Sequence, residues 1–254
     1  MIKYLWKNKY TLFSCTLFLA LWEVVAFIIN NDIYIPKIEL IFGELFNLVM
    51  DEKFYMYVTS SFIRTLISYI CALVLSVFLG ILSSMYPVFK DFISPLNSFV
   101  RTIPTLVLVV LALIWFTKES APFIVGFAII FPILYEGIQN SLTKIDNRII
   151  EMTAIYEVCI FDKIRKIYLP TIKFYIMNIF VSTLSLTFKV VIAGEVHGQP
   201  KYGIGSQIQL EKVNFNTPGI FAWIIIIVFI SLVFERINVK LNKSTYRWLN
   251  EDKY

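Results

Sequence analysis

The chain has 254 residues, of which 58% are apolar or aromatic and 16% are charged, and its mean hydropathy is +0.72. Soluble domains carry about 25% charged residues, so this composition excludes an ordinary soluble domain. The net charge is +5, the three cysteines lie far apart, and no repeat or low-complexity tract occurs, which excludes disulfide-rich, collagen-like and disordered classes. The composition indicates an integral membrane protein.

Six apolar stretches are candidates for membrane spans. In chain order they cover residues 12–29, 66–82, 95–116, 121–135, 174–194 and 219–234. Several are shorter than the roughly 20 residues that an isolated span requires, so neighbouring helices must shield their polar ends. The sequence therefore predicts an all-α membrane protein with six transmembrane helices packed as a bundle.

Lysine and arginine are divided unevenly between the segments that join these stretches. Fifteen of the 23 lie in the two terminal tails, between the second and third spans, and between the fourth and fifth spans. Five lie in the other connecting segments. Because cytoplasmic segments carry the excess of Lys and Arg, we predict that both termini are cytoplasmic, which six spans permit.

Two periodic patterns describe how the helices pack. On the predicted outer side, residues 35–50 repeat apolar side chains at helical spacing, which predicts an amphipathic helix at the membrane surface or a helix that caps the bundle. In the second span, small residues recur at every fourth position: Ser68, Ala72, Ser76, Gly80 and Ser84. Such rows allow close approach of helix backbones, so we expect this span to pack tightly against another.

Ionisable residues inside or at the edges of the spans are functional candidates, because charge is costly in lipid. Glu23 and Lys189 are the deepest, and Arg64, Glu136 and Glu195 lie nearer the ends. They are either ion relays, as in a secondary transporter, or groups that form structural ion pairs or extend toward the headgroups. The second interpretation is favoured for Arg64 and Glu136.

The residues needed for catalysis are missing from the sequence. His197 is the single histidine, so neither a metal cluster nor a serine triad is expected. No glycine precedes a lysine, so the phosphate-binding loop G-x-x-x-x-G-K-[ST] does not occur. We therefore predict that the chain is not an enzyme, has no ATPase site of its own and carries no cofactor.

The predicted cytoplasmic segment between the fourth and fifth spans is the most informative one. Residues 151–170 read EMTAIYEVCIFDKIRKIYLP, with apolar and aromatic side chains that water would not cover and charges gathered in the second half. The pattern predicts an amphipathic helical hairpin ended by Pro170. Apolar surface rimmed by charge marks either a partner surface or a face packed under the chain's own bundle.

This segment resembles the "EAA" loop of binding-protein-dependent ABC importer permeases, whose pattern is E-A-A-x3-G-x9-I-x-L-P. Glu151 matches the first position, and Ile167, Leu169 and Pro170 match the end at the same spacing. Met152 and Thr153 replace the two alanines, and Glu157 replaces the glycine. In that family the loop is a coupling helix that docks into a cleft on the cytoplasmic ATPase subunit.

The resemblance extends over nearly the whole chain, to the nitrate, sulfonate and taurine branch of the family. The matching segments are Leu21-Trp22-Glu23, Ile35-Pro36, Ser61 to Arg64, Arg101 to Pro104, Leu113 to Phe116, Phe131-Pro132-Ile133, and Glu195 followed by Gly203-Ile204-Gly205. Each is short, and their order and spacing together carry the resemblance. Thr117 stands where the branch usually has glycine.

The resemblance implies a type I importer permease in the cell membrane that forms the pathway for a small solute by alternating access. The solutes of the branch include sulfonates, taurine, nitrate and pyrimidine precursors. The implied partners are an ATPase subunit that binds ATP, an extracytoplasmic solute-binding protein and a second permease copy, with no nucleic acid. The predicted ATPase-coupling residues are Glu151, Ile155, Tyr156, Glu157, Phe161, Ile167, Leu169 and Pro170.

The same interpretation divides the chain into three parts. Residues 1–57 hold the N-terminal tail, the first span and the outer amphipathic segment; residues 58–239 form a five-helix permease core that includes the coupling loop 149–170; residues 240–254 form a cytoplasmic tail.

Two other functions compete with that of an importer permease. One is an ion-coupled secondary transporter that uses Lys189 and Glu23, although no internal repeat is found. The other is a membrane-embedded enzyme, for which the catalytic residues are missing.

Overall fold

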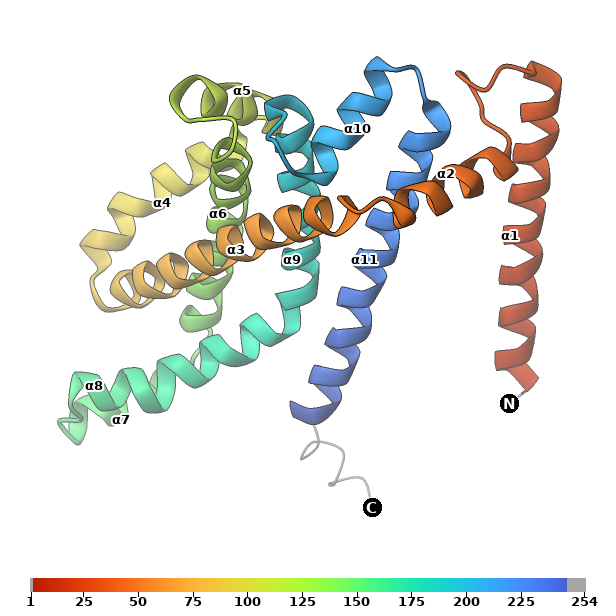
Figure 1. The fold of residues 1–254 in the computed structure, drawn as a ribbon. Coiled ribbons are helices and arrows are strands. Elements are labelled where there is room, and N and C mark those ends of the chain that lie inside the picture. The colour runs from red at the N-terminus through yellow and green to blue at the C-terminus, as the bar shows by residue number, and fades with distance from the viewer. Residues whose placement is uncertain (1, 246–254) are drawn as a thin grey trace. The chain divides into compact units, whose positions relative to one another are not determined.

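The computed structural model describes residues 2–245, and within this range the chain is helical without β-strands. The helices are α1 Ile2–Ile29, α2 Ile38–Met50, α3 Phe54–Met85, α4 Pro87–Thr102, α5 Thr105–Trp115, α6 Ala121–Thr143, α7 Asn147–Ile155, α8 Ile160–Lys163, the π-helix η1 Ile164–Tyr168, α9 Leu169–Gly198, α10 Ile204–Val213 and α11 Thr217–Thr245 (Figure 1). The predicted all-α class is confirmed. The end of the predicted cytoplasmic tail, residues 246–254, lies outside the described residues.

Several helices are long and apolar enough to cross a membrane. In the described chain, four pass this test singly: α3, α6, the continuous helix Ile160–Gly198 and the first part of α11, Thr217–Arg236. A fifth is obtained if α4 and α5 are counted as one broken span. The predicted first span falls in α1, whose apolar part Thr16–Ile29 is shorter. The chain is therefore a multi-pass membrane protein, and the total of six spans stays a prediction.

The predicted third span is not one straight helix. The chain bends by 101° between α4 and α5, at Ile103 and Pro104. Ile103 is extended, with φ −71° and ψ 124°, as expected for a residue that precedes proline, and Pro104 has no N–H with which to continue the helix. The predicted third span, residues 95–116, is therefore broken at this position.

The described chain forms two compact units. One contains the residues up to Tyr55 together with Gln207–Val228, and therefore holds α1, α2, most of α10 and the first part of α11. The other contains Met56–Ser206 together with the described residues from Phe229 onward. All the predicted coupling residues belong to the second unit, so its internal packing decides where they lie.

The predicted close packing of α3 is realised against α6. Ser68, Ala72, Ser76 and Gly80 are buried, and Ser84 at the end of the row is half-buried. The Ser76 hydroxyl donates a 3.1 Å hydrogen bond to the Phe131 carbonyl of α6. A Cβ atom on Gly80 would lie 2.6 Å from Cγ2 of Ile138, so only a residue without a side chain fits there.

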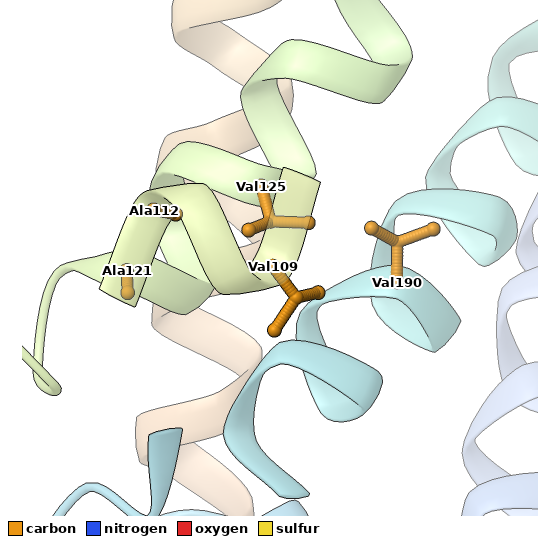
Figure 2. Close-up of a cluster of buried hydrophobic side chains, with 5 residues drawn as sticks. All are labelled: Val109, Ala112, Ala121, Val125 and Val190. Carbon is orange, nitrogen blue, oxygen red and sulfur yellow. The ribbon is translucent and has the colours of Figure 1, made fainter. Parts of the chain in front are cut away.

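A second set of small side chains joins α5, α6 and α9. Figure 2 shows five buried residues meeting where these helices pack: Val109, Ala112, Ala121, Val125 and Val190. Their small volumes bring α5, the second half of the broken span, close to α6 and α9. The bend and this packing together fix the position of α5 in the second unit.

Candidate functional site

The predicted coupling loop is a compact helical element between α6 and α9. α7 begins after Asp146, whose carboxylate accepts a 2.9 Å hydrogen bond from the Arg148 N–H and so caps the helix. The chain then turns through residues 156–159 into the short helix α8. Two helices joined by a turn are what the sequence predicted here.

Glu157 forms the turn that ends α7. Its φ is 48°, in the left-handed region that glycine adopts most readily. The N–H of Glu157 bonds to the Ala154 carbonyl at 3.2 Å, and the N–H of Val158 bonds to the Thr153 carbonyl at 2.9 Å. This pattern is a Schellman motif, which normally has glycine at the left-handed position. The replacement of the family's glycine by Glu157 therefore leaves the turn in place.

The tip of the loop exposes large apolar side chains. Ile155 is 77% exposed, Tyr156 74% and Phe161 68%. Met152 and Ile160 are exposed beside them. We call these five residues, Met152, Ile155, Tyr156, Ile160 and Phe161, the apolar tip. Of the two alternatives that the sequence left open, packing beneath the chain's own bundle is excluded for these side chains.

The predicted coupling residues fall into two groups. Glu151 and Glu157 are exposed around the apolar tip, beside Ile155, Tyr156 and Phe161. Ile167, Leu169 and Pro170 lie at the base of the loop instead, where Ile167 and Pro170 line an open groove of about 580 Å³ between the C-terminal end of α6, α7 and the start of α9. Lys144, Asp146 and Lys166 also line this groove, and Lys166 pairs with Asp162.

Pro170 does not end the second helix of the loop. Residues Ile160–Gly198 form one continuous helix, in which α8 leads through the π-helix η1 directly into α9. The Leu169 N–H bonds to the Ile164 carbonyl, five residues back. This wider turn lies directly before Pro170, which has no N–H to donate and a ring that crowds the preceding helical turn. The predicted stop at Pro170 is therefore corrected to a local π-helical turn.

Tyr168 was not among the predicted residues, yet it fastens the loop to the bundle. Its side chain is buried in a cluster with Ile138, Leu142 and Ile172. The Lys163 ammonium lies 5.6 Å from the centre of the Tyr168 ring. The signal was present in the sequence, because Tyr168 and Ile172 stand four residues apart on one face of a helix. This anchor holds the apolar tip at a fixed place relative to α6.

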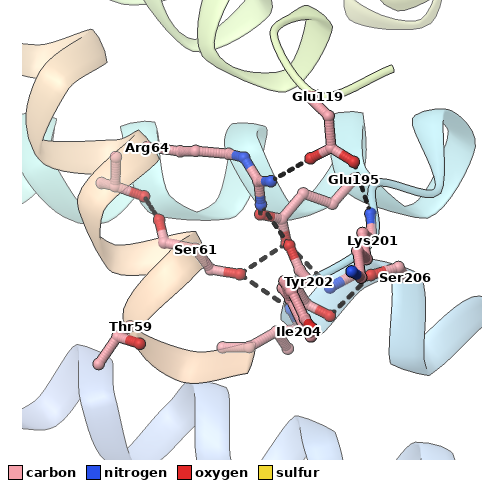
Figure 3. Close-up of polar contacts among 12 residues, drawn as sticks. Thr59, Ser61, Arg64, Glu119, Glu195, Lys201, Tyr202, Ile204 and Ser206 are labelled. Carbon is pink, nitrogen blue, oxygen red and sulfur yellow. Dashed lines mark hydrogen bonds and ion pairs between the residues drawn. The ribbon is translucent and has the colours of Figure 1, made fainter. Parts of the chain in front are cut away.

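A second polar site lies at the other end of α9, around Arg64. One guanidinium nitrogen, Nη1, donates to Glu195 Oε1 at 2.8 Å and to the Tyr202 carbonyl at 2.6 Å. The other, Nη2, donates to Glu119 Oε2 at 2.8 Å. Figure 3 shows the three charged side chains converging from α3, α9 and the segment before α6. The Glu195 side chain is completely buried, so Arg64 supplies the counter-charge that this burial requires.

Backbone and hydroxyl groups satisfy the rest of the Glu195 carboxylate. The Ser61 hydroxyl donates to Oε2 at 2.7 Å, and the Gly205 N–H donates to the same atom at 3.0 Å (Figure 3). A Cβ on Gly203 would lie 2.7 Å from the carboxylate carbon, which explains the glycine there. The sequence segments S-x-x-R and E…G-I-G thus meet in one network, and the structural ion pair favoured for Arg64 is found.

The other charged residues of the spans also have partners, with one exception. Glu136 pairs with Arg101, beside the break between α4 and α5. Glu23 accepts a 3.1 Å hydrogen bond from the N–H of Ile38, the first residue of α2. Lys189 is exposed on α9 and forms neither an ion pair nor a hydrogen bond within the described chain. The Glu23 carboxylate thus satisfies a backbone N–H at the start of α2, inside the first unit.

Residues 72–246, more than half of the chain, match the family described as binding-protein-dependent transport system inner membrane component. The chain belongs to this family. The match covers α6, the coupling loop and α9, and so contains the apolar tip and most of the Arg64–Glu195 network. The resemblance to ABC importer permeases is thereby confirmed.

Three similar proteins carry names from the same family. A protein of Methanocaldococcus jannaschii named as an ABC transporter permease is 26% identical over 223 residues, which covers 85% of this chain and 83% of that protein. SsuC of Bacillus subtilis, named as an aliphatic sulfonates transport permease, is 20% identical over 235 residues, which cover 91% of this chain and 84% of that protein. GbuB of Listeria monocytogenes, named as a glycine betaine/carnitine transport permease, is 22% identical over 199 residues, which cover 78% of this chain and 70% of that protein.

Proposed function

We propose that this permease is the membrane subunit of an ATP-driven importer and that its apolar tip docks into the ATPase subunit. The observation that carries the proposal is the exposure of Ile155, Tyr156 and Phe161 on an anchored loop. Large apolar side chains in water are costly, and buried aromatic anchors dominate the affinity of protein interfaces. ATP is bound by the partner, because the chain lacks a phosphate-binding loop.

The helix Ile160–Gly198 provides a mechanical connection for this mechanism. Its first turns carry Phe161 of the apolar tip, and its far end carries Glu195, which is held by Arg64. Closure of two ATPase subunits on ATP would press the coupling loops of two permease copies together and tilt these helices. The tilt would alternate access between the two sides of the membrane, as a shift between two pre-existing conformations.

The assignment of sides follows from the distribution of charge. In this proposal the coupling loop 149–170, the groove lined by Lys144 and Lys166, and both termini face the cytoplasm, where Lys and Arg are enriched. The Arg64–Glu195 network then lies toward the outer side, where an extracytoplasmic solute-binding protein delivers the solute. The predicted parts 1–57, 58–239 and 240–254 keep their roles in this arrangement.

We propose a small organic or inorganic solute, with sulfonates as the leading class. The sulfonate-branch segments in the sequence support this choice, as does the similarity to a permease named for aliphatic sulfonates. Taurine, nitrate and pyrimidine precursors belong to the same proposal. The binding protein would set most of the selectivity among them.

Copurification of the ATPase subunit tests the docking surface. Replacing both Tyr156 and Phe161 with Asp places two charges where the interface needs apolar anchors, so we expect the ATPase to be lost while the permease stays in the membrane. A loss of about 2 kcal/mol already lowers affinity roughly thirtyfold. The matched control is Tyr34→Asp, which changes a tyrosine that is 73% exposed outside the loop. Normal copurification of the double variant would show that the ATPase docks elsewhere.

A further inference from the structure

Among the described residues, Lys189 is the one charged side chain inside a predicted span that has neither an ion-pair nor a hydrogen-bond partner. Arg64 is paired with Glu195 and Glu119, and Arg101 is paired with Glu136. Lys189 lies on α9 between Lys173 and Glu195, which are the nearest charged residues on either side of it in the sequence. It is six residues from Glu195, or about 9 Å along the helix axis. A cation inside a membrane span requires water or an anion beside it.

Polar side chains continue from Lys189 along one face of α9. Asn178, Ser182, Ser185 and Lys189 are spaced by four, three and four residues, which places them on a single stripe. Asn178, Ser182 and Lys189 are exposed, and Ser185 is half-buried. The opposite side of the helix packs into the bundle, with Thr187 and Val191 buried. The stripe therefore faces away from the chain's own core, although polar groups gain nothing from contact with lipid.

We propose that Lys189 is an anion-binding group in the translocation pathway, which holds the acidic group of the solute as it moves along α9. This proposal rests on the proposed function as a permease and deepens it by naming a negatively charged solute. The ammonium of Lys189 offers three hydrogen-bond donors, and the hydroxyl of Ser185 lies one turn along the helix. The Ser182 hydroxyl, two turns along, donates to the Ile179 carbonyl at 2.8 Å and adds a polar surface to the stripe. A sulfonate, which has three acceptor oxygens and one negative charge, matches this set of groups.

Thiol modification beside Lys189 tests this proposal without knowledge of the solute. The three native cysteines are replaced with serine, and Ser185→Cys then places a thiol one helical turn from the ammonium. The probes are two methanethiosulfonates, one that carries a sulfonate and one that carries a trimethylammonium group. We expect both to react from water and the anionic one to be favoured. Lys189→Gln should lower the anionic-to-cationic rate ratio about tenfold, as expected when a nearby charge is removed.

Controls separate this effect from general changes in surface charge. Lys189→Arg keeps the charge and should keep the rate ratio, and Lys212→Gln removes an exposed lysine from α10 and should leave it unchanged. No reaction at residue 185 in any nucleotide state would mean that Lys189 faces lipid and extends its ammonium toward the headgroups. That result, or a ratio that Lys189→Gln does not change, would overturn the proposal.

Uptake into proteoliposomes that contain the permease, its ATPase and its binding protein provides the second test. We expect Lys189→Gln to lower the uptake of labelled ethanesulfonate about tenfold while the ATPase still copurifies, and Lys189→Arg to restore it. Unchanged uptake by Lys189→Gln would contradict the role of Lys189 and leave the permease function standing. An unmodified permease that binds no ATPase would contradict the proposed function instead, and the thiol rates would still decide the role of Lys189.

Discussion

At the scale of single residues, Glu157 shows how a coupling loop keeps its shape without its usual glycine. The φ of 48° places a residue with a Cβ in the left-handed region, which is unfavourable by about 1 kcal/mol. The two Schellman hydrogen bonds and the anchor at Tyr168 hold the turn in spite of this cost. The strain is therefore local and can be removed by one substitution.

We predict that Glu157→Gly stabilises the permease and leaves ATPase binding intact. Glycine occupies the left-handed region without a steric penalty, so the gain should be about 1 kcal/mol, seen as a higher thermal unfolding midpoint in detergent. The matched control is Ala154→Gly, which introduces the same residue into the right-handed part of α7 and should cost about 0.5–1 kcal/mol. If both variants shift the midpoint in the same direction, the interpretation of the turn is wrong.

At the scale of secondary-structure elements, the packing of α3 on α6 depends on residues with small side chains or none. Gly80 faces Ile138, and the hydroxyl of Ser76 reaches the α6 backbone. Lipid provides no hydrophobic force between helices, so close contact and these hydrogen bonds hold the pair together. α6 in turn packs most extensively against α9, so the fit of α3 supports the helix that carries Lys189.

We predict that Gly80→Ala destabilises the permease by about 1–3 kcal/mol, because the new methyl group overlaps Ile138. The measurement is the thermal unfolding midpoint of the purified protein. Gly43→Ala on α2 is the matched control, since a Cβ at that position meets no atom within 4 Å. Alanine there should be neutral or stabilising by about 0.5–1 kcal/mol. Equal midpoints for the two variants would show that the α3–α6 contact is not limiting for stability.

Local features of the fold could be predicted from the sequence, and the long-range pairings could not. The apolar runs predicted the helices that are long enough to span a membrane, and the small residues of α3 predicted the face on which that helix packs. The partner of Arg64 is Glu195, 131 residues away, and no spacing rule connects residues that distant. The bend at Pro104 had a local signal, but a proline inside an apolar run is compatible with either a kinked span or a broken one.

The candidate site was predicted to a similar extent. The motif and the apolar positions predicted the position of the loop. Three of the predicted coupling residues, Ile155, Tyr156 and Phe161, are among its most exposed side chains. Continuation of the helix past Pro170 depends on the π-helical turn at Ile164–Tyr168, which has no recognisable sequence pattern here. The lack of an ion-pair partner for Lys189 within the described chain could not be predicted from the sequence, because it depends on which residues pair with the other charges.

At the scale of the whole molecule, the proposed mechanism is that of a permease that transmits energy and does not capture it. In our proposal the apolar tip would receive the movement of a partner, the helix Ile160–Gly198 would carry that movement, and Lys189 would hold the solute on the way. The competing account is a secondary transporter, in which the chain would use an ion gradient through its own ionisable groups. The two accounts differ in the source of energy.

Solute uptake by the reconstituted complex, energised either by ATP inside the ATPase-containing compartment or by an ion gradient alone, distinguishes an ATP-driven importer from a secondary transporter. We predict that ATP together with the partner ATPase and the binding protein drives accumulation, and that the Tyr156→Asp, Phe161→Asp variant abolishes it. The permease alone should hydrolyse no ATP. Sustained accumulation by the permease alone, driven by a proton or sodium gradient and unaffected by the double variant, would contradict the account.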